Sequence, residues 1–441
     1  MQQFNNLIEF RQAVYDQALT QARDAQFELV DALLFSAPIR TFPDLSRSPA
    51  FRRQWPSVYA AVEDGCQDRE WLERYLARLV PSNGILIFPL DVTPWPHIAA
   101  RTMPDRQYVH SGSDTGLGLP VVVAHPYSVL AWAPERNTSW APPLSIRRVP
   151  SQKTDIGVGV EQVKQLCCDR RQEMLDALHL IVADGKYGNH SFLGALKQEP
   201  CGVLARMRCD RVLHKAPSGY SGCGRPRVHG ERFAFKEPET WGEPQGTVEL
   251  EDDKWGQVRL RRWDGLHARQ DATTVFSVLL VEAHRERDTS AKPLWLAYLP
   301  PPGQQPGDQP LVSLWRGYQH RWPVEPATRF RKQSLAWTLP RFQDGDACDR
   351  WTLLVTLAQW QLFLARDLIV DQPLPWQRAQ EKPTPERVLQ GLAGLFSQIG
   401  TPTQEPKARG KSLGWPKGKL RTRRERYRVV KKPRKKAKQK R

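Results

Sequence analysis

Residues 84 to 185 alternate between strand-like and helix-like patterns, and this order limits the folds open to the chain. The runs GILIFPLD and LPVVVAHPYSVLAWAP are short, apolar and bounded by glycine, proline and polar residues, which predicts two strands of a buried sheet. VGVEQVKQLCCDRRQEMLDAL has helical spacing and leads directly into a third apolar run, LHLIVADG. The order strand, strand, helix, strand indicates a mixed α/β core.

The patterns on either side divide the 441 residues into further units. Apolar residues recur at three- and four-residue spacing over positions 1–80, which predicts a helical domain, and the β-like alternation after residue 200 predicts an inserted lobe. Helical patterns then return the chain to the core. We therefore expect a helical domain at 1–80, a core in two parts at 81–200 and 291–372, a β-rich lobe at 201–290, a linker at 373–406 and a tail at 407–441.

The positive charge of the chain is concentrated in this tail. The formal net charge is +18, and residues 407–441 hold eighteen Lys or Arg and one acid, Glu425, which gives +17 and leaves +1 for the rest of the chain. Such a segment is expected to be disordered when free and to bind a polyanion. Residues 1–80 hold nine basic and eleven acidic residues, so their charge does not indicate DNA binding. With no run of eighteen apolar residues and no signal-peptide pattern, we expect a soluble protein inside the cell.

Two of the apolar runs are followed directly by an aspartate. Asp91 follows Ile85 to Leu90, and Asp184 follows Leu178 to Ala183. Since ligands of open α/β sheets bind at the carboxyl ends of strands, the two acids could converge there. The alternative is that each aspartate caps a turn after its strand.

A third acid stands alone in the basic and aromatic stretch YQHRWPVEPATRFRKQSLAW. On a helix, Tyr318, Arg321, Glu325 and Lys332 fall within about 60° of one another, which places the acid among cations and a phenol. The alternative is a solvated face on which Arg321 and Glu325 form an i,i+4 pair. Prolines 323 and 326 oppose an uninterrupted helix, so the helix is expected to bend here.

These residues carry a resemblance to a known family. The spacing of Tyr318, Arg321, Glu325 and Lys332 resembles the Y-R-E-K signature of DDE-type transposases from bacterial insertion sequences, and LDVTPWP and IVADGKYG resemble that family's first and second aspartate motifs. The resemblance covers residues 81 to 370, and GRPRVHGERF followed by ETW is similar to the inserted β region of one subgroup. It implies an RNase H-like core interrupted by a β-rich insertion, which fits the long stretch of sequence between Asp184 and Glu325.

The resemblance assigns Asp91, Asp184 and Glu325 as the catalytic residues and as ligands of Mg²⁺, for which Mn²⁺ can substitute. The chemistry agrees, because cutting and rejoining a phosphodiester requires two hard cations, and carboxylate oxygens are suitable ligands. Arg321 and Lys332 are expected to contact phosphates, and Tyr318 either to hydrogen-bond a phosphate or to pack beneath the site.

In the predicted lobe, Arg206 and Arg208 alternate onto one face of a strand, which indicates a DNA-contact surface, with a solvated face as the alternative. Trp241 is a candidate for stacking on a flipped base, as an aromatic residue does in related transposases, and the alternative is a core tryptophan.

The sequence therefore predicts a DNA transposase of the prokaryotic cytoplasm, associated with the nucleoid. Its expected partners are double-stranded DNA, in the form of the terminal inverted repeats of its own element, and a second copy of itself. The alternatives are a non-catalytic relative that binds nucleic acid through its basic tail, and an RNase H-like repair nuclease.

Overall fold

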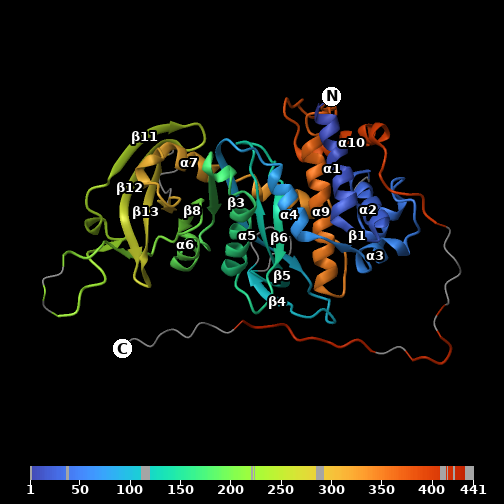
Figure 1. The fold of residues 1–441 in the computed structure, drawn as a ribbon, viewed down its shortest axis with the longest axis horizontal. Helices are drawn as coiled ribbons and strands as arrows, with labels where there is room; N and C mark the ends of the chain where they lie inside the picture. Colours follow the sequence, from blue (N-terminus) through green and yellow to red (C-terminus); the bar gives the residue numbers. More distant parts are fainter. Residues whose placement is uncertain are drawn as a thin grey trace.

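The computed structural model describes residues 2–35, 39–110, 120–219, 222, 224–284, 293–407, 414, 416–420 and 423–432. Figure 1 shows strands forming the middle and one end of the molecule, and a group of helices at the other end.

The N-terminal residues are helical, as expected, but not in one unbroken helix. After α1 the chain passes through a π-helical turn and a short strand before α2 begins. The buried Arg11 of α1 pairs with Asp31 of α2 at 2.7 Å, and it also donates to Gln361 of α9 at 2.5 Å. This contact joins the N-terminal helices to a helix from the C-terminal part of the sequence. The elements are α1 (Gln2–Ala13), β1 (Leu19–Gln21), α2 (Arg23–Phe35), α3 (Pro56–Glu63), β2 (Cys66–Gln67) and α4 (Arg69–Arg78).

The core is a mixed sheet in which the strands run in the order β6–β5–β3–β7–β8. The pairs β6–β5 and β5–β3 are antiparallel, whereas β3–β7 and β7–β8 are parallel. Helix α5 connects β6 to β7, and α6 connects β7 to β8, as parallel pairs require. This topology is consistent with an RNase H-like nuclease fold. The elements are β3 (Gly84–Pro96), β4 (Gln107–His110), β5 (Val121–Ala131), β6 (Pro143–Arg148), α5 (Asp155–Asp169), β7 (Ala177–Ala183), α6 (His190–Leu196) and β8 (Gly202–Met207).

The strands of the expected insertion extend this same sheet. β8 pairs with β14 on its other edge, and β13 and β12 follow, so the core sheet passes without a gap into the later strands. We call strands β9 to β13 the β lobe. Figure 1 shows β11, β12 and β13 curving away from the core. The strands are β9 (Val212–His214), β10 (Arg232–Ala234), β11 (Gly246–Asp252), β12 (Gly256–Ala268), β13 (Asp271–His284) and β14 (Leu294–Leu299).

Four helices follow β14 in the described residues. The bend expected at the prolines is a complete break: α7 ends at Gln319, and α8 begins after Pro323, where a proline fits because the first N–H groups of a helix have no partner inside it. Helix α9 is apolar and almost wholly buried, and the indole of its Trp360 donates to Pro143 of β6 at 2.7 Å. No described helix meets the length and hydropathy needed to span a bilayer. The helices are α7 (Leu311–Gln319), α8 (Val324–Gln333), α9 (Gly345–Ala365) and α10 (Pro385–Ile399).

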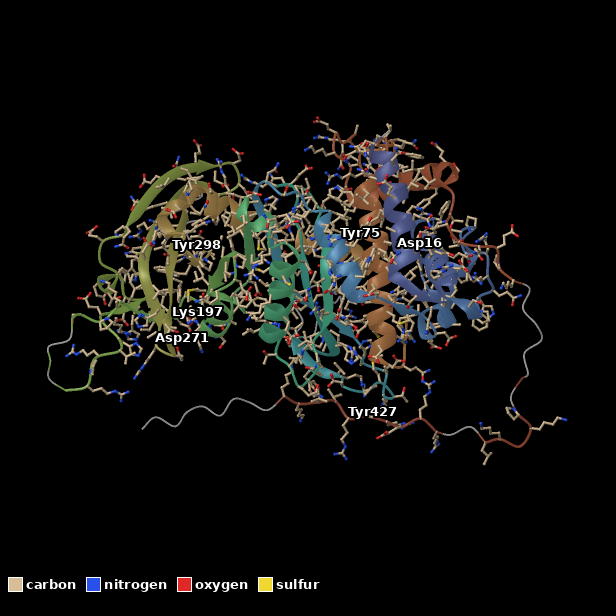
Figure 2. The ribbon with its side chains drawn as sticks, viewed as in Figure 1. Asp16, Tyr75, Lys197, Asp271, Tyr298 and Tyr427 are labelled. Carbon is tan, nitrogen blue, oxygen red and sulfur yellow. The ribbon has the colours of Figure 1, made fainter. Side chains whose placement is uncertain are left out.

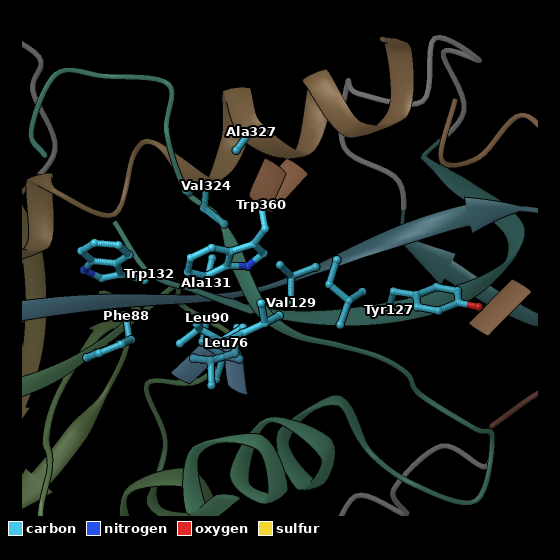
Figure 3. Close-up of a cluster of buried hydrophobic side chains, with 14 of the residues drawn as sticks. Leu76, Phe88, Leu90, Tyr127, Val129, Ala131, Trp132, Val324, Ala327 and Trp360 are labelled. Carbon is cyan, nitrogen blue, oxygen red and sulfur yellow. The ribbon is translucent and has the colours of Figure 1, made fainter. Parts of the chain in front are cut away.

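The first turn of α8 is fixed in the hydrophobic core. Figure 3 shows Val324 and Ala327 among side chains from β3, β5 and α9. Both residues are fully buried, and they stand on either side of Glu325 in the sequence. The core therefore sets the position from which Glu325 projects.

Part of the tail also differs from expectation. Residues 423–432 lie against the core, and Figure 1 shows this red segment beneath β4 and β5. The open edge of β4 supplies hydrogen-bond partners that tail composition alone does not reveal. Residues 433–441, which the expectation of disorder also covered, lie outside the described residues.

Candidate active site

Asp91 and Asp184 lie side by side on neighbouring parallel strands. The β3–β7 pairing ends with Leu90 opposite Ala183, and the two aspartates follow that pair directly. Adjacent strands are about 4.8 Å apart, so the side chains start from neighbouring backbone positions. The carboxylate of Asp91 accepts the N–H of Val92 at 2.8 Å, and that of Asp184 accepts the N–H of Lys186 at 3.0 Å.

The expectation that both aspartates end a strand is correct for Asp184 and wrong for Asp91. β7 ends at Ala183, but β3 continues to Pro96. The reason is the second neighbour of β3, because β5 remains paired with it from Leu90 to Pro96 after β7 has ended. Asp91 is thus a mid-strand residue held by an antiparallel ladder, which fixes its backbone more firmly than a loop would.

Glu325 comes to the site from the first turn of α8, and Arg321 from the link between α7 and α8. A terminal nitrogen of Arg321 donates to Oε1 of Glu325 at 2.9 Å. The Arg321 side chain is only 18% exposed, whereas that of Glu325 is 48% exposed. The i,i+4 pair considered from the sequence is therefore present, but its cation is mostly buried rather than part of a solvated face.

The charges of these four residues act on one another. Burial and the negative charge of Asp184 raise the pKa of Asp91 to about 6; Glu325 adds to the rise, and Arg321 opposes it. Burial would lower the pKa of Arg321, but Tyr318, Asp91, Glu325 and Asp184 together raise it above its usual value. Since such interactions require proximity, all three acids lie near the Arg321 guanidinium, which pairs with Glu325. We call Asp91, Asp184, Glu325 and Arg321 the carboxylate site.

Three further sequence candidates lie beside this site. Nζ of Lys332 donates to Oγ1 of Thr93 at 2.6 Å, two residues beyond Asp91 on β3. Burial raises the pKa of Tyr318, while Arg321 and Arg206 lower it, so both arginines are near the phenol. Arg206 itself is exposed. Lys332 of α8 and Arg321 of the α7–α8 link thus lie beside the carboxylates, and Arg206 of β8 lies near Tyr318.

A cavity of about 780 Å³ opens beside Tyr318, Arg321 and Arg206. Its wall includes Trp322, whose side chain is 46% exposed, and Lys254, whose Nζ is 5.8 Å from the Trp322 ring centroid. Neither residue was singled out from the sequence. Trp322 directly follows Arg321 and could have been noticed, but its exposure could not be inferred, and Lys254 comes from a distant β-turn.

Two candidates from the predicted lobe are not brought to the site. Arg208 pairs with Asp210 at 2.8 Å on the exposed surface. The indole N–H of Trp241 donates to the carbonyl of Ala234 at 2.8 Å, and its ring lies 5.1 Å from that of Trp295 inside an aromatic cluster. This placement corresponds to the alternative interpretation of Trp241 as a core tryptophan.

The donor set suits Mg²⁺ or Mn²⁺. Among the described residues, no group of three His, Cys, Asp or Glu side chains is arranged so that it could hold a metal ion. Mg²⁺ does not require one, since it keeps several waters and takes one or two carboxylates. Burial and repulsion by Asp184 both raise the pKa of Asp91, and the repulsion is the interaction that a divalent cation would relieve. Asp91, Asp184 and Glu325 therefore fit such an ion by charge and ligand type.

A mixed sheet with two aspartates beside each other at its central parallel strands is consistent with a nuclease-type enzyme. The sequence pattern of the DDE superfamily endonucleases matches residues 14–269, which is more than half of the chain, and the protein belongs to this family. Enzymes of this family generally use divalent metal ions. The matched range contains Asp91 and Asp184 and ends before Glu325, so the Y-R-E-K assignment rests on the residues themselves.

The other comparisons add little. A search of curated proteins gave no match. Among solved structures, the C-terminal lobe of a budding yeast Argonaute is similar over 75% of this chain at 9% identity, with a TM-score of 0.22, and the match covers 58% of that chain. A similarity this low carries no argument about fold or function.

Proposed function

We propose that this DDE superfamily endonuclease is a DNA transposase, which cuts the ends of its own element and joins them to new DNA. The observation that carries the proposal is the carboxylate site. Asp91 and Asp184 directly follow a pair of residues on two parallel strands. The charges of Asp184, Glu325 and Arg321 influence the pKa of Asp91, and the three acids raise the pKa of Arg321. This arrangement supports the assignment of Asp91, Asp184 and Glu325 as the catalytic triad. Family membership supports DNA as the substrate.

Each residue has a role that follows from its chemistry. Bound Mg²⁺ would supply activation of the attacking oxygen and stabilisation of the leaving oxygen. The three carboxylates would hold that ion at the end of the β3–β7 ladder, and Arg321 presents a fork suited to phosphate. Lys332 adds a point charge close to Asp91, and its bond to Thr93 restricts where that charge can lie.

The cavity beside Tyr318 supports a single-stranded or distorted DNA end as the bound species. An exposed indole such as Trp322 can stack on any base, and the neighbouring lysine and arginine side chains suit a phosphate backbone. We assign the RNase H-like core to residues 81–200 and 291–372 together with β8 (Gly202–Met207), and the insertion to the rest of residues 201–290. The partners in this proposal are terminal inverted repeats and a second copy of the chain, in a prokaryotic cytoplasm.

A donor-cleavage assay tests the proposal. Purified protein is incubated with a plasmid carrying the native flanks of the gene and with Mg²⁺ or Mn²⁺, and the products are mapped. Wild type is compared with Glu325→Gln and with Glu249→Gln, a matched control whose exposed carboxylate pairs with Arg259 at 2.7 Å on the β lobe. We expect metal-dependent cuts at the element boundary with wild type and Glu249→Gln, and none with Glu325→Gln.

The other outcomes separate the alternatives. Equal DNA binding by all three proteins with no cutting would indicate a non-catalytic relative. Metal-dependent cutting that ignores the element boundary, but still requires Glu325, would indicate a repair nuclease. Cutting by Glu325→Gln at the wild-type rate would remove Glu325 from the active site.

A further inference from the structure

The edge of the catalytic sheet is covered by residues from the end of the chain. β4 is the last strand on its side of the sheet. The backbone N–H of Val430 donates to the carbonyl of Arg106 at 2.7 Å, and that of Tyr427 donates to the carbonyl of Arg101 at 2.9 Å. Gln107 and Val430 form a parallel bridge. We call residues 423–432 the docked strand.

Arg106 is a buried residue of the core that binds the docked strand. It is only 4% exposed, and its guanidinium donates to the carbonyls of Tyr427 at 2.8 Å, Met103 at 3.2 Å and His97 at 3.4 Å. Burying a cation is costly unless its donors are satisfied. One of these donors is satisfied by the docked strand itself, so docking and the burial of Arg106 support each other.

Side chains hold both ends of the docked strand. Arg424 donates to Gln343, in the segment before α9, and Nζ of Lys432 donates to the carbonyl of Lys153 at 3.0 Å. Val429 and Val430 are half-buried against the core. Figure 2 shows Tyr427 on this extended segment beneath the core. The segment is thus positioned at several points along its length.

The outer surface of the docked strand is cationic. Six of its ten residues are Lys or Arg and one is Glu425, a balance of +5. An extended segment of this length spans about 33 Å, close to the length of ten base pairs. The six basic residues are all exposed: Arg423, Arg424, Arg426, Arg428, Lys431 and Lys432.

The sheet register sets the distance from this surface to the carboxylate site. Pro96, Ala124, Gln107 and Val430 form one row across the sheet. Asp91 lies five residues before Pro96, about 17 Å along β3, and Val430 lies three strand spacings away, about 14 Å. The separation is therefore about 22 Å, which corresponds to about six base pairs of B-DNA.

We propose that the docked strand is a fixed contact for the phosphate backbone of duplex DNA, about six base pairs from the bond that the carboxylate site cuts. This inference rests on the proposed DNA-cleaving function. It differs from binding by a free basic tail, because a free tail holds DNA at no defined distance, whereas a docked cationic strand positions the duplex against the active site.

The test separates docking from charge. All forms carry Glu325→Gln, so that binding is measured without cutting. The first is a double variant, Tyr427→Pro with Val430→Pro. It keeps every charge but removes the two backbone N–H groups that donate to Arg101 and Arg106. Arg426→Gln/Arg428→Gln/Lys431→Gln keeps the donors and removes three charges. Lys436→Gln/Lys438→Gln/Lys440→Gln is the matched control, which removes three charges from the last residues of the same tail.

The probe is a fluorescein-labelled duplex of about 30 base pairs, long enough to reach past the docked strand, with anisotropy followed from about 0.05 to 0.2 M NaCl. We expect the proline variant and the docked-strand charge variant each to bind about tenfold or more weakly than the parent. Loss of three phosphate contacts should reduce the slope of log K against log salt by about 2.7. The matched control should lose less affinity than either.

Hydrogen exchange provides a readout that does not depend on DNA. In the parent, the amides of Tyr427 and Val430 should be protected; in the proline variant, the amides around them should exchange freely while the core stays protected. Unprotected amides in the parent would overturn the docking. Parent-like DNA binding by the proline variant, with equal losses for the two charge variants, would show a free tail and overturn the proposal. If the parent itself binds no duplex, the proposed DNA-cleaving function fails as well.

Discussion

The carboxylate site and the β lobe contain the same kinds of charged residue but balance them differently. In the β lobe several cations each pair with one acid, as Arg261 does with Glu282 at 3.0 Å and Lys215 with Glu231 at 2.9 Å. In the carboxylate site, three acids act on Arg321. Paired exposed charges contribute little beyond solubility, whereas an excess of one sign in a half-buried place creates affinity for the opposite charge.

The aromatic residues of the two regions differ in the same way. The lobe packs its rings against one another and against β14, with Phe235 stacked on Trp295 of β14 at 4.1 Å. Beside the carboxylate site, Trp322 is left exposed at the wall of a cavity. The comparison assigns the lobe a structural role at these rings and the α7–α8 link a binding role.

The sharpest test replaces one packed tryptophan, Trp241, and one exposed tryptophan, Trp322, with alanine. Trp241→Ala should destabilise the protein by about 3 kcal/mol, because it removes a packed ring and its hydrogen bond to Ala234. Trp322→Ala should change stability by less than about 0.5 kcal/mol but weaken single-stranded DNA binding by about 1–3 kcal/mol. Thermal melts measure the change in stability, and anisotropy with a labelled oligonucleotide measures the change in binding. If both variants lose the same amounts of stability and binding, the two tryptophans do not differ in role.

The three acids of the carboxylate site could be singled out from the sequence because the relevant patterns are local; their catalytic role stays a prediction. An apolar run before Asp91 and another before Asp184 identify two core strands, and the spacing from Tyr318 to Lys332 places the third acid. Even so, the prolines predict only a bend where α7 and α8 are separated by a break. The break does not separate the residues of the motif: Tyr318, Arg321, Glu325 and Lys332, spaced three to seven positions apart, still lie near one another.

The features that the sequence did not reveal depend on distant partners. β3 continues past Asp91 because β5 is there to pair with it, and Trp241 is covered by rings from β10, β12 and β14. Residues 423–432 dock because β4, from a much earlier part of the sequence, has an open edge. Composition describes a tail as basic, but only the folded sheet shows where it can lie.

A second test concerns the unbalanced charge itself. The folded-state pKa of Asp91 is about 6, raised from 3.8, so the metal-free folded protein keeps a proton that the unfolded chain releases. Stability from this group is therefore full below about pH 4 and is lost as pH rises through 6. Asp91→Asn cannot ionise, and in EDTA it should exceed wild type by about 2 kcal/mol at pH 8 but match it at pH 4.

The measurement is a denaturant or thermal unfolding series of both proteins across this pH range. Mg²⁺ should reduce the difference in stability between the two proteins at pH 8. The bound cation stabilises the ionised Asp91 of wild type, whereas the variant offers it one carboxylate fewer. A stability difference that does not change with pH would mean that neither burial nor the nearby acids raise the pKa of Asp91, and the contrast with the lobe would disappear.

The smallest expected effect is a difference in DNA binding between variants of two arginines, Arg206 and Arg208, which are two positions apart. Arg206 lies beside Tyr318 at the cavity wall, whereas Arg208 is paired with Asp210 on the exposed surface. Arg206→Gln should weaken duplex binding about fivefold near 0.15 M salt and reduce the log–log salt slope by about 0.9, as expected for one phosphate contact. Arg208→Gln should change neither by more than the scatter of the measurement, because its charge is already balanced. If both substitutions reduce the slope equally, the surface around Arg208 binds DNA as well, and the ion pair with Asp210 does not exclude Arg208 from the DNA interface.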